Sequence, residues 1–156
     1  MNVISIAVCM LFGVFVSNNP SEVDQKKMID QVNVIRTHGC HCGRTYMAPV
    51  QPVKWNNTLY KSALEQAEEM ETHHFFNHYS IDGLNIGQRL DQVGYNWEVA
   101  GENLGEGQET FEEVLKEWMA SYSHCKMLMH PKVEEMAVAR YGHYWVQHFG
   151  KQLRRK

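Results

Sequence analysis

The amino-acid sequence predicts an α+β domain in which several helices precede a C-terminal pair of β-strands. Apolar residues recur at helical spacing in four segments between residues 21 and 122. Beyond Pro131 the spacing changes to the alternation of apolar and polar residues that is typical of strands. Helices and strands are therefore separated along the chain, which favours an α+β fold over repeated βαβ units.

Size and charge limit the class of protein. With 156 residues, 44% of them hydrophobic, the chain is long enough to form one domain with its own core. The net charge is -3, but the basic tail, residues 151–156, holds four of the 15 basic residues and no acid. The remainder carries 11 basic against 18 acidic residues, which argues against nucleic acid as a partner.

The N-terminal segment, residues 1–17, differs from the rest. An apolar run of 14 residues extends from Val3 to Val16 and is interrupted only by Ser5 and Gly13. This length suits the core of a signal peptide and is short for a membrane span, which needs roughly 20 residues. We expect export to the extracellular space or the periplasm. A retained anchor is the alternative, because no basic residue precedes the run, and it would then be the protein's contact with a membrane.

The first half of the domain contains two predicted helices. A capping-box-like start at Ser21 opens the first, and Gly39 ends it. Residues 40–56 include two prolines and have no helical period, so we expect an extended loop. An apolar stripe from Thr58 towards His74 predicts the second helix.

The second half predicts two more helices and a hairpin. Apolar spacing at Ile86, Leu90 and Val93 predicts a short helix that ends at Gly94, and the glycine-rich residues 95–107 look extended. Thr110 and Glu113 form the clearest capping box of the chain, ahead of an apolar stripe. The segments EMAVARY and YWVQHFG predict an antiparallel hairpin that turns at Gly142 and His143. We expect the hairpin to be covered by the preceding helix, through the following four residues: Trp118 and Tyr122 of the helix, and Val138 and Val146 of the hairpin.

Three polar residues stand in distinctive local sequences: His78 in FFNHYSIDG, Glu102 in AGENLGEG and His124 in SYSHCKMLMHP. Each alone has an ordinary structural explanation, such as a loop acid or a histidine at a helix end. His74 and His78 are four residues apart, but Phe75 stands where the zinc-protease motif HExxH has its glutamate, which argues against a helical site of that kind.

Taken in order, these motifs, followed by EEMAVARYGHYWVQHFG, resemble the CAP superfamily of cysteine-rich secretory, antigen 5 and pathogenesis-related class one proteins. The chain looks closest to the secreted bacterial SCP-like branch. The similarity runs from about Met28 to Gly150, within a CAP/SCP-like domain that we assign to residues 22–150. The resemblance implies a three-layer α-β-α sandwich with a central antiparallel sheet and a groove lined by two histidines and one or two acids.

Carried over by motif, the resemblance places His78, Glu102 and His124 in the groove. A second acid of many relatives corresponds to Ser121, so the set of four is incomplete here and Ser121 would line the groove instead. Two imidazoles and one carboxylate can hold zinc, with His78 and His124 as the metal ligands. The same three residues can equally form a hydrogen-bonded cluster without a metal.

Three cysteines lie outside the N-terminal run. The segment HGCHCG has one residue between Cys40 and Cys42, whereas structural zinc sites usually place two to four there. The resemblance implies a disulfide between Cys42 and Cys125, which leaves Cys40 as a free thiol. Pairing of Cys40 with Cys125 stays open as the alternative.

We therefore expect an exported, monomeric CAP/SCP-like domain whose groove binds a small molecule, peptide, lipid or cell-wall fragment. We expect zinc to bind weakly and no other cofactor. One alternative is a zinc-dependent, peptidase-like hydrolase that uses Glu102 as its catalytic group together with His78 and His124. No serine stands in a G-x-S-x-G nucleophile motif. The second alternative is a structural or partner-binding exoprotein.

Overall fold

The structure of the protein is a computed structural model that describes residues 20–154. The signal peptide or anchor predicted for residues 1–17 lies outside this range. Within it, no helix is both long enough and apolar enough to cross a bilayer.

Five helices and six strands make up the described chain. The helices are α1 (Glu22–His38), α2 (Asn57–His73), α3 (Ile86–Gln92), α4 (Phe111–Ala120) and α5 (Tyr122–Leu128). The strands are β1 (Cys40–Cys42), β2 (Thr45–Met47), β3 (Lys54–Trp55), β4 (Trp97–Glu106), β5 (Glu135–Tyr141) and β6 (Tyr144–Gln152).

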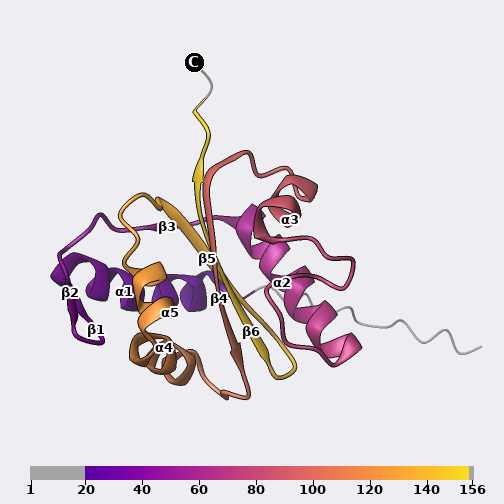
Figure 1. The fold of residues 1–156 in the computed structure, drawn as a ribbon, viewed down its shortest axis with the longest axis horizontal. Coiled ribbons are helices and arrows are strands. Elements are labelled where there is room, and N and C mark those ends of the chain that lie inside the picture. Colours follow the sequence, from indigo (N-terminus) through magenta and orange to yellow (C-terminus); the bar gives the residue numbers. More distant parts are fainter. Residues whose placement is uncertain (1–19, 155–156) are drawn as a thin grey trace, which may run out of the picture.

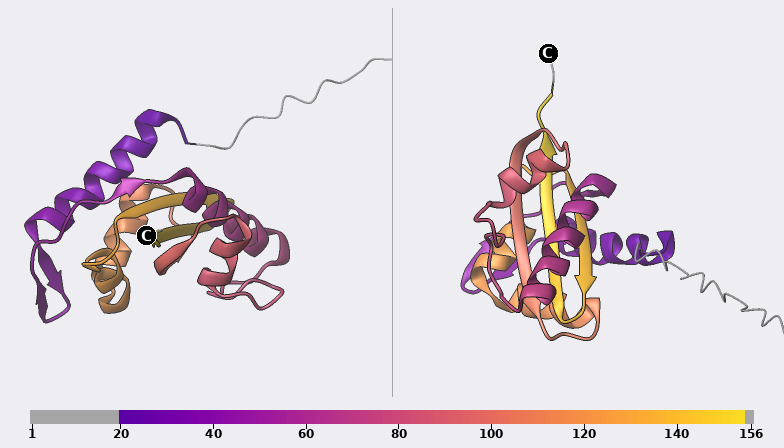
Figure 2. Two further views of the ribbon diagram at one scale, coloured as in Figure 1. Left: turned by 90° about the horizontal axis from the view of Figure 1, so that it is seen from above. Right: turned by 90° about the vertical axis from the view of Figure 1, so that its right-hand side faces the viewer.

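The elements form three layers around one sheet. The sheet has the strand order β3-β5-β6-β4, so β4 is an edge strand. Helices α1, α4 and α5 lie on one face and α2 and α3 on the other, which Figures 1 and 2 show from three directions. The predicted α+β sandwich is confirmed. Its sheet is antiparallel except between β3 and β5, which run parallel and are joined by two residue pairs.

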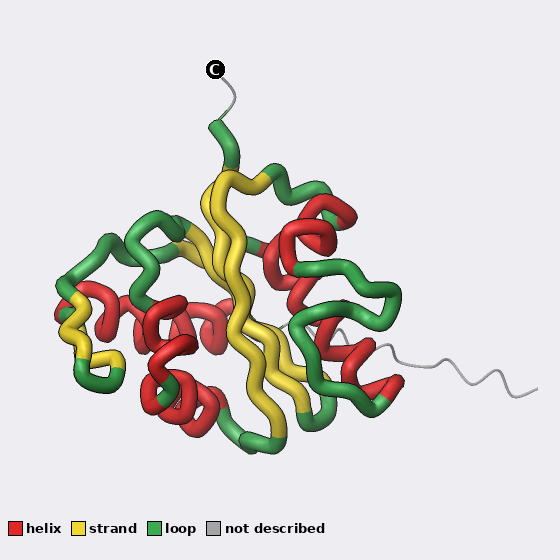
Figure 3. The backbone as a smooth tube through the Cα atoms, viewed as in Figure 1, coloured by secondary structure: helices red, strands yellow, loops and turns green. Residues whose placement is uncertain are grey.

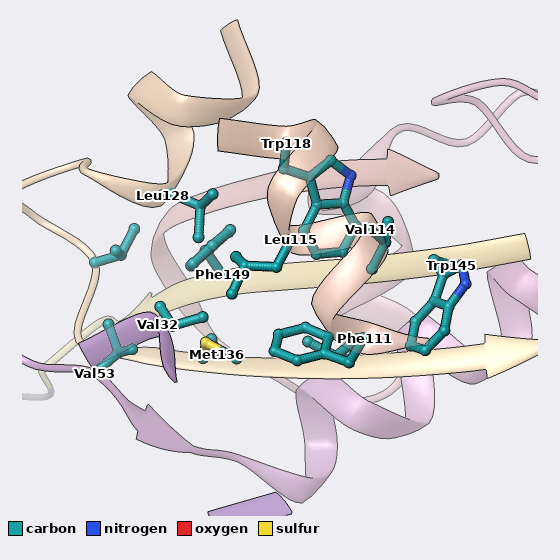
Figure 4. Close-up of a cluster of buried hydrophobic side chains, with 12 residues drawn as sticks. Val32, Val53, Phe111, Val114, Leu115, Trp118, Leu128, Met136, Trp145 and Phe149 are labelled. Atoms are coloured by element: carbon teal, nitrogen blue, oxygen red, sulfur yellow. The ribbon is translucent and has the colours of Figure 1, made fainter. Parts of the chain in front are cut away.

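Alternation along the strands divides the core into two clusters. On β6, Trp145 and Phe149 pack with Phe111 and Trp118 of α4, as Figure 4 shows. Their neighbour Val146 points to the opposite face, where it joins the cluster built on α2 and α3. Successive strand residues point to opposite faces, so one strand contributes to both clusters.

This alternation corrects part of the predicted helix-hairpin packing. Trp118 and Val138 share one buried cluster, as predicted. The expected contact with Val146 is wrong, because that side chain lies on the other side of the sheet. Tyr122 is also not a core residue. The helical stripe is broken at Ser121, which has an extended backbone, and Tyr122 begins α5 with 51% of its surface exposed.

Two segment boundaries also differ from the sequence-based expectation. The loop predicted for residues 40–56 contains the β1-β2 hairpin and the short strand β3. Strand β6 continues to Gln152, which pairs with Trp97, so the first two residues of the basic tail belong to the sheet.

Candidate functional site

Glu102 lies at the centre of the candidate site, on the edge strand β4. Its Cα pairs with that of His148 on β6, and its side chain is 2% exposed. Three side chains contact its carboxylate. His78 Nδ1 lies 2.7 Å from Oε1, His148 Nε2 lies 2.8 Å from Oε2, and an Arg89 guanidinium nitrogen lies 2.5 Å from Oε2. A buried carboxylate needs such partners to remain ionised.

Arg89 connects this carboxylate to the loop between α2 and α3. It projects from α3, which begins with a capping box at Asn85. One guanidinium nitrogen contacts Glu102, and the other donates to the main-chain oxygens of His78 (2.8 Å) and Leu84 (2.9 Å). Arg89 thus binds both the loop and the carboxylate. Its side chain is only 7% exposed, so these contacts are largely shielded from water.

His78 is the exposed member of the site. It lies in the loop that follows α2 and that Figure 3 shows crossing back towards α3. The loop turns at Asp82 and Gly83, with a positive φ of 83° at Gly83, whose N–H donates to the Ser80 carbonyl. The His78 side chain is 58% exposed. Because Nδ1 contacts Glu102, Nε2 remains for another partner.

The charges of the site depend on one another. Burial alone would raise the pKa of Glu102, but the hydrogen bonds from His148 and His78 and the charge of Arg89 lower it to about 2. The hydrogen bond to Glu102 raises the pKa of His78, whereas burial lowers the pKa of His148. At neutral pH the site therefore contains an ionised carboxylate and a neutral, buried His148.

His124 approaches the site from the other side of the sheet. It lies on α5, and its carbonyl accepts a hydrogen bond of 3.3 Å from the Asn103 side chain, which points away from the Glu102 face. Burial lowers the pKa of His124, and the charge of His78 lowers it further. Among residues 20–154, no hydrogen bond joins the His124 ring to His78 or Glu102.

Ser121 caps the junction of α4 and α5, and its hydroxyl lies 3.3 Å from that of Ser123. It is partly exposed. Its hydroxyl therefore makes a local contact with the same turn that leads to His124.

The donor atoms of His78, Glu102 and His124 are not gathered as a ready metal site. Within the described chain, the group of three His, Cys, Asp or Glu donors lying within 4.8 Å of one another is Cys40, Cys42 and Cys125. Glu102 is buried and its carboxylate has three partners, so it does not fit a zinc ligand. A histidine that binds a metal commonly directs its other ring nitrogen at a carboxylate, which is the arrangement of His78. His78 therefore has the arrangement of a metal-binding histidine, whereas among residues 20–154 no hydrogen bond links it to His124, the other predicted ligand.

The predicted disulfide between Cys42 and Cys125 is present. It joins strand β1 to helix α5 across 83 residues, with a Cα–Cα distance of 5.4 Å. Because Cys125 follows His124 directly, the bridge fixes the helix turn that carries this histidine. Cys40 is the free cysteine of the described residues.

Sequence reasoning missed Arg89 and His148. Arg89 stands in none of the quoted motifs, and His148 lies in YWVQHFG, which alternation identifies only as a core strand. A signal was present in the pairing of the strands. Had β4 been aligned with β6, Glu102 would have faced His148, and a buried acid requires a partner of this kind.

Residues 29–149 match the family described as the Cysteine-rich secretory protein family, or CAP. The chain therefore belongs to the CAP family. It is 30% identical over 134 residues to the uncharacterized protein YkwD of Bacillus subtilis, covering 83% of this chain and 49% of that protein. The chain thus spans about half the length of this relative.

Solved structures share the fold at low sequence identity. An extracellular SCP-domain protein from Bacillus anthracis has a TM-score of 0.72 and 22% identity, covering 83% of this chain and 41% of that one. An outer surface protein from Borrelia burgdorferi has a TM-score of 0.71 and 20% identity, covering 86% and 97%. A structure of NaASP2 with Zn²⁺ has a TM-score of 0.58 and 15% identity, covering 83% and 80%.

Proposed function

We propose that this protein is an exported CAP domain that binds a ligand at the exposed ring of His78, beside His124. The observation that carries the proposal is the 2.7 Å contact between His78, which is 58% exposed, and Glu102, which is 2% exposed. A buried, ionised carboxylate fixes the orientation and charge of a ring that faces solvent. A polar group oriented in this way is suited to recognition.

The surroundings of His78 favour a ligand with apolar parts. Phe76, Tyr79 and Ile81 in the same loop are 48%, 56% and 60% exposed. An oriented polar group among exposed apolar side chains matches a peptide, a lipid or a cell-wall fragment better than a small ion alone.

Export is supported by three independent observations. The apolar run of residues 1–17 has the length of a signal-peptide core. A disulfide across 83 residues is typical of proteins in oxidising compartments. The related SCP-domain protein from Bacillus anthracis is described as extracellular, and the related protein from Borrelia burgdorferi as an outer surface protein.

Zinc would be held by the rings of His78 and His124, with Glu102 orienting His78 from behind. A metal ion there would supply a Lewis acid next to the bound ligand. Two protein ligands are fewer than the three of catalytic zinc sites, so we expect weak binding. The structure of NaASP2 with Zn²⁺ supports this idea for the fold.

The geometry favours binding over hydrolysis. As the catalytic group of a hydrolase, Glu102 would need to reach the substrate and exchange a proton near neutral pH. Its side chain is instead 2% exposed, and its pKa is lowered to about 2. We therefore propose that Glu102 is a positioning residue for His78.

Calorimetric titration of zinc into metal-free protein tests the metal part of this proposal. We expect weak binding to the wild type and its loss in His78→Ala and His124→Ala. His73→Ala, at the exposed end of α2, is the matched control and should bind as the wild type does. Equal affinities in all four proteins would reject a metal at this place.

Nuclear magnetic resonance tests the ligand part. A soluble muropeptide, an unstructured peptide and phospholipid micelles are titrated separately into labelled protein. We expect one of them to shift the amide signals of residues 76–81 and 124, with a weaker response in His78→Ala. If none of the three shifts these signals, the loop is not a binding surface for these ligand classes and the proposal is wrong.

A further inference from the structure

The free thiol of Cys40 lies against the disulfide. Its Sγ is 3.8 Å from the Sγ of Cys125, which is already bonded to Cys42. Cys40 and Cys42 are the first and last residues of strand β1, and residues two apart in a strand point to the same face. Both therefore direct their sulfurs at the same atom of helix α5.

The three sulfurs differ in their access to solvent. Cys42 and Cys125 are completely buried, whereas Cys40 is partly exposed. Apolar side chains surround the group, with Met129 fully buried beside the disulfide and Ile35, Met47, Val50 and Met119 packed around it. A reagent in solution consequently reaches the Cys40 thiol before it reaches the disulfide.

We propose that Cys40 exchanges with the Cys42–Cys125 disulfide, so that the bridge to α5 alternates between two cysteines of β1. In the step, the Cys40 thiolate attacks Cys125 Sγ. The Cys40–Cys125 bond forms, the Cys42–Cys125 bond breaks, and Cys42 leaves as a thiolate that takes up the proton lost by Cys40. The number of disulfides is unchanged, so no oxidant or reductant is needed.

The fold places both cysteines of β1 next to Cys125. Strand β1 is held by three pairs with β2, which fix Cys40 and Cys42 relative to each other. Moving the bond shifts the attachment point by two residues along the same strand face. Burial raises the pKa of the Cys40 thiol, so few molecules hold the reactive thiolate and exchange is slow compared with an activated cysteine.

As a consequence, Cys40 can replace Cys42 as the partner of Cys125. In the exchanged state, Cys40 ties the hairpin to α5 and Cys42 carries the free thiol. Exchange also moves the free thiol from the partly exposed position 40 to the buried position 42, where oxidants reach it less easily. This inference rests on the sulfur positions and does not require the proposed ligand site.

Acid trapping of the wild-type protein tests the exchange directly. The folded, non-reduced protein is equilibrated at mildly alkaline pH, unfolded in acid to stop exchange, and alkylated with a thiol reagent that reacts in acid. Fragmentation of the peptide that contains residues 40–42 then locates the label. We expect label on both cysteines, with most of it on Cys40. Label on Cys40 alone would overturn the proposal.

Two serine variants test whether either bridge can form. In Cys42→Ser, folded with oxidised glutathione as the oxidant, we expect Cys40 to pair with Cys125, leaving no free thiol among these residues when the unfolded protein is titrated. In the matched variant Cys40→Ser, the Cys42–Cys125 bridge should persist. Two free thiols in folded Cys42→Ser, as judged by circular dichroism, would also overturn the proposal. The wild-type experiment stays decisive if this variant does not fold.

Discussion

Glu102 and His148 face each other across strands β4 and β6, joined by a 2.8 Å hydrogen bond between two buried side chains. The register of the sheet fixes this pair, because a shift of one residue would turn each side chain to the opposite face. His78 instead reaches Glu102 from a loop. The pairing of the strands thus fixes the position of the Glu102 carboxylate, and the carboxylate in turn orients the exposed His78 ring.

Arg89 supplies the permanent positive charge of this group, so its removal should destabilise the fold strongly. We expect Arg89→Met to lower the free energy of unfolding by about 3–5 kcal/mol, since it leaves Glu102 as a buried charge with too little compensation. Two hydrogen bonds to the loop main chain are lost as well. Urea denaturation at neutral pH measures the change.

Lys26→Met is the control for the loss of a positive charge. Lys26 forms an exposed ion pair with Asp30 on α1, and such pairs contribute about 0–1 kcal/mol. Equal losses in the two variants would contradict the special role of the buried arginine. Arg89→Lys, which keeps the charge but not the forked geometry, should fall between them.

The protein should lose stability in acid in two stages. Burial lowers the pKa of His148 from its ordinary value of 6.5. The contribution of the neutral ring to the free energy of unfolding is therefore complete above pH 6.5 and is lost as the pH falls below this value. The pKa of Glu102 is lowered from 4.5 to about 2, so its contribution is lost between these values. His78 acts oppositely. Its raised pKa adds stability below pH 6.5 that disappears as the pH rises through the folded value.

Glu102→Gln isolates the carboxylate stage. The variant should be less stable than the wild type at neutral pH, because the amide cannot replace the charge that Arg89 faces. The difference in free energy of unfolding should shrink as the pH falls from 4.5 towards 2, where the wild-type carboxylate also becomes neutral. Urea denaturation over this range measures it, and a constant difference would count against an ionised Glu102.

The helices could be predicted from the sequence because their ends are encoded locally. Ser21 accepts from the Asp24 N–H at the start of α1, and Thr110 and Glu113 form the predicted capping box of α4. The packing of Tyr122 could not be predicted in this way. Its helical spacing continues that of Trp118, and the break at Ser121 has no proline or glycine to signal it.

The site could be predicted only in part for a related reason. His78 and Glu102 stand in recognisable motifs, and their contact is present. Arg89 and His148 depend on the packing of α3 and on the pairing of β4 with β6, which single segments do not reveal. The charge of His78 lowers the pKa of His124, but His124 lies on a helix at the other face of the sheet, which its motif does not reveal.

Gly150 marks a close contact in β6 that should tolerate no side chain. A Cβ at this position would lie 2.4 Å from the hydroxyl oxygen of Tyr95 and 2.7 Å from two of its ring carbons. Tyr95 is buried and donates a 2.6 Å hydrogen bond to Glu135, so the ring has little freedom to move. We expect Gly150→Ala to cost about 1–3 kcal/mol. Thermal or urea unfolding that shows a gain in stability would contradict this packing.

Trp118 should be the residue of α4 on which the first core cluster most depends. It is 1% exposed, and its Nε1 donates a 2.8 Å hydrogen bond to the Leu104 carbonyl of β4. We expect Trp118→Ala to cost about 3–5 kcal/mol, because it leaves a large cavity and an unpaired carbonyl. Trp118→Phe keeps most of the packing and should cost less.

Tyr122→Ala is the matched control, since the sequence places both aromatic residues on one stripe while the structure buries only the first. Tyr122 is 51% exposed and contacts Lys126 through its ring. A surface substitution of this kind changes the free energy of unfolding by about 0.5 kcal/mol or less. Urea denaturation of the three variants compares the losses. If Tyr122→Ala lost as much stability as Trp118→Ala, the helix would continue through Ser121 and the break between α4 and α5 would be wrong.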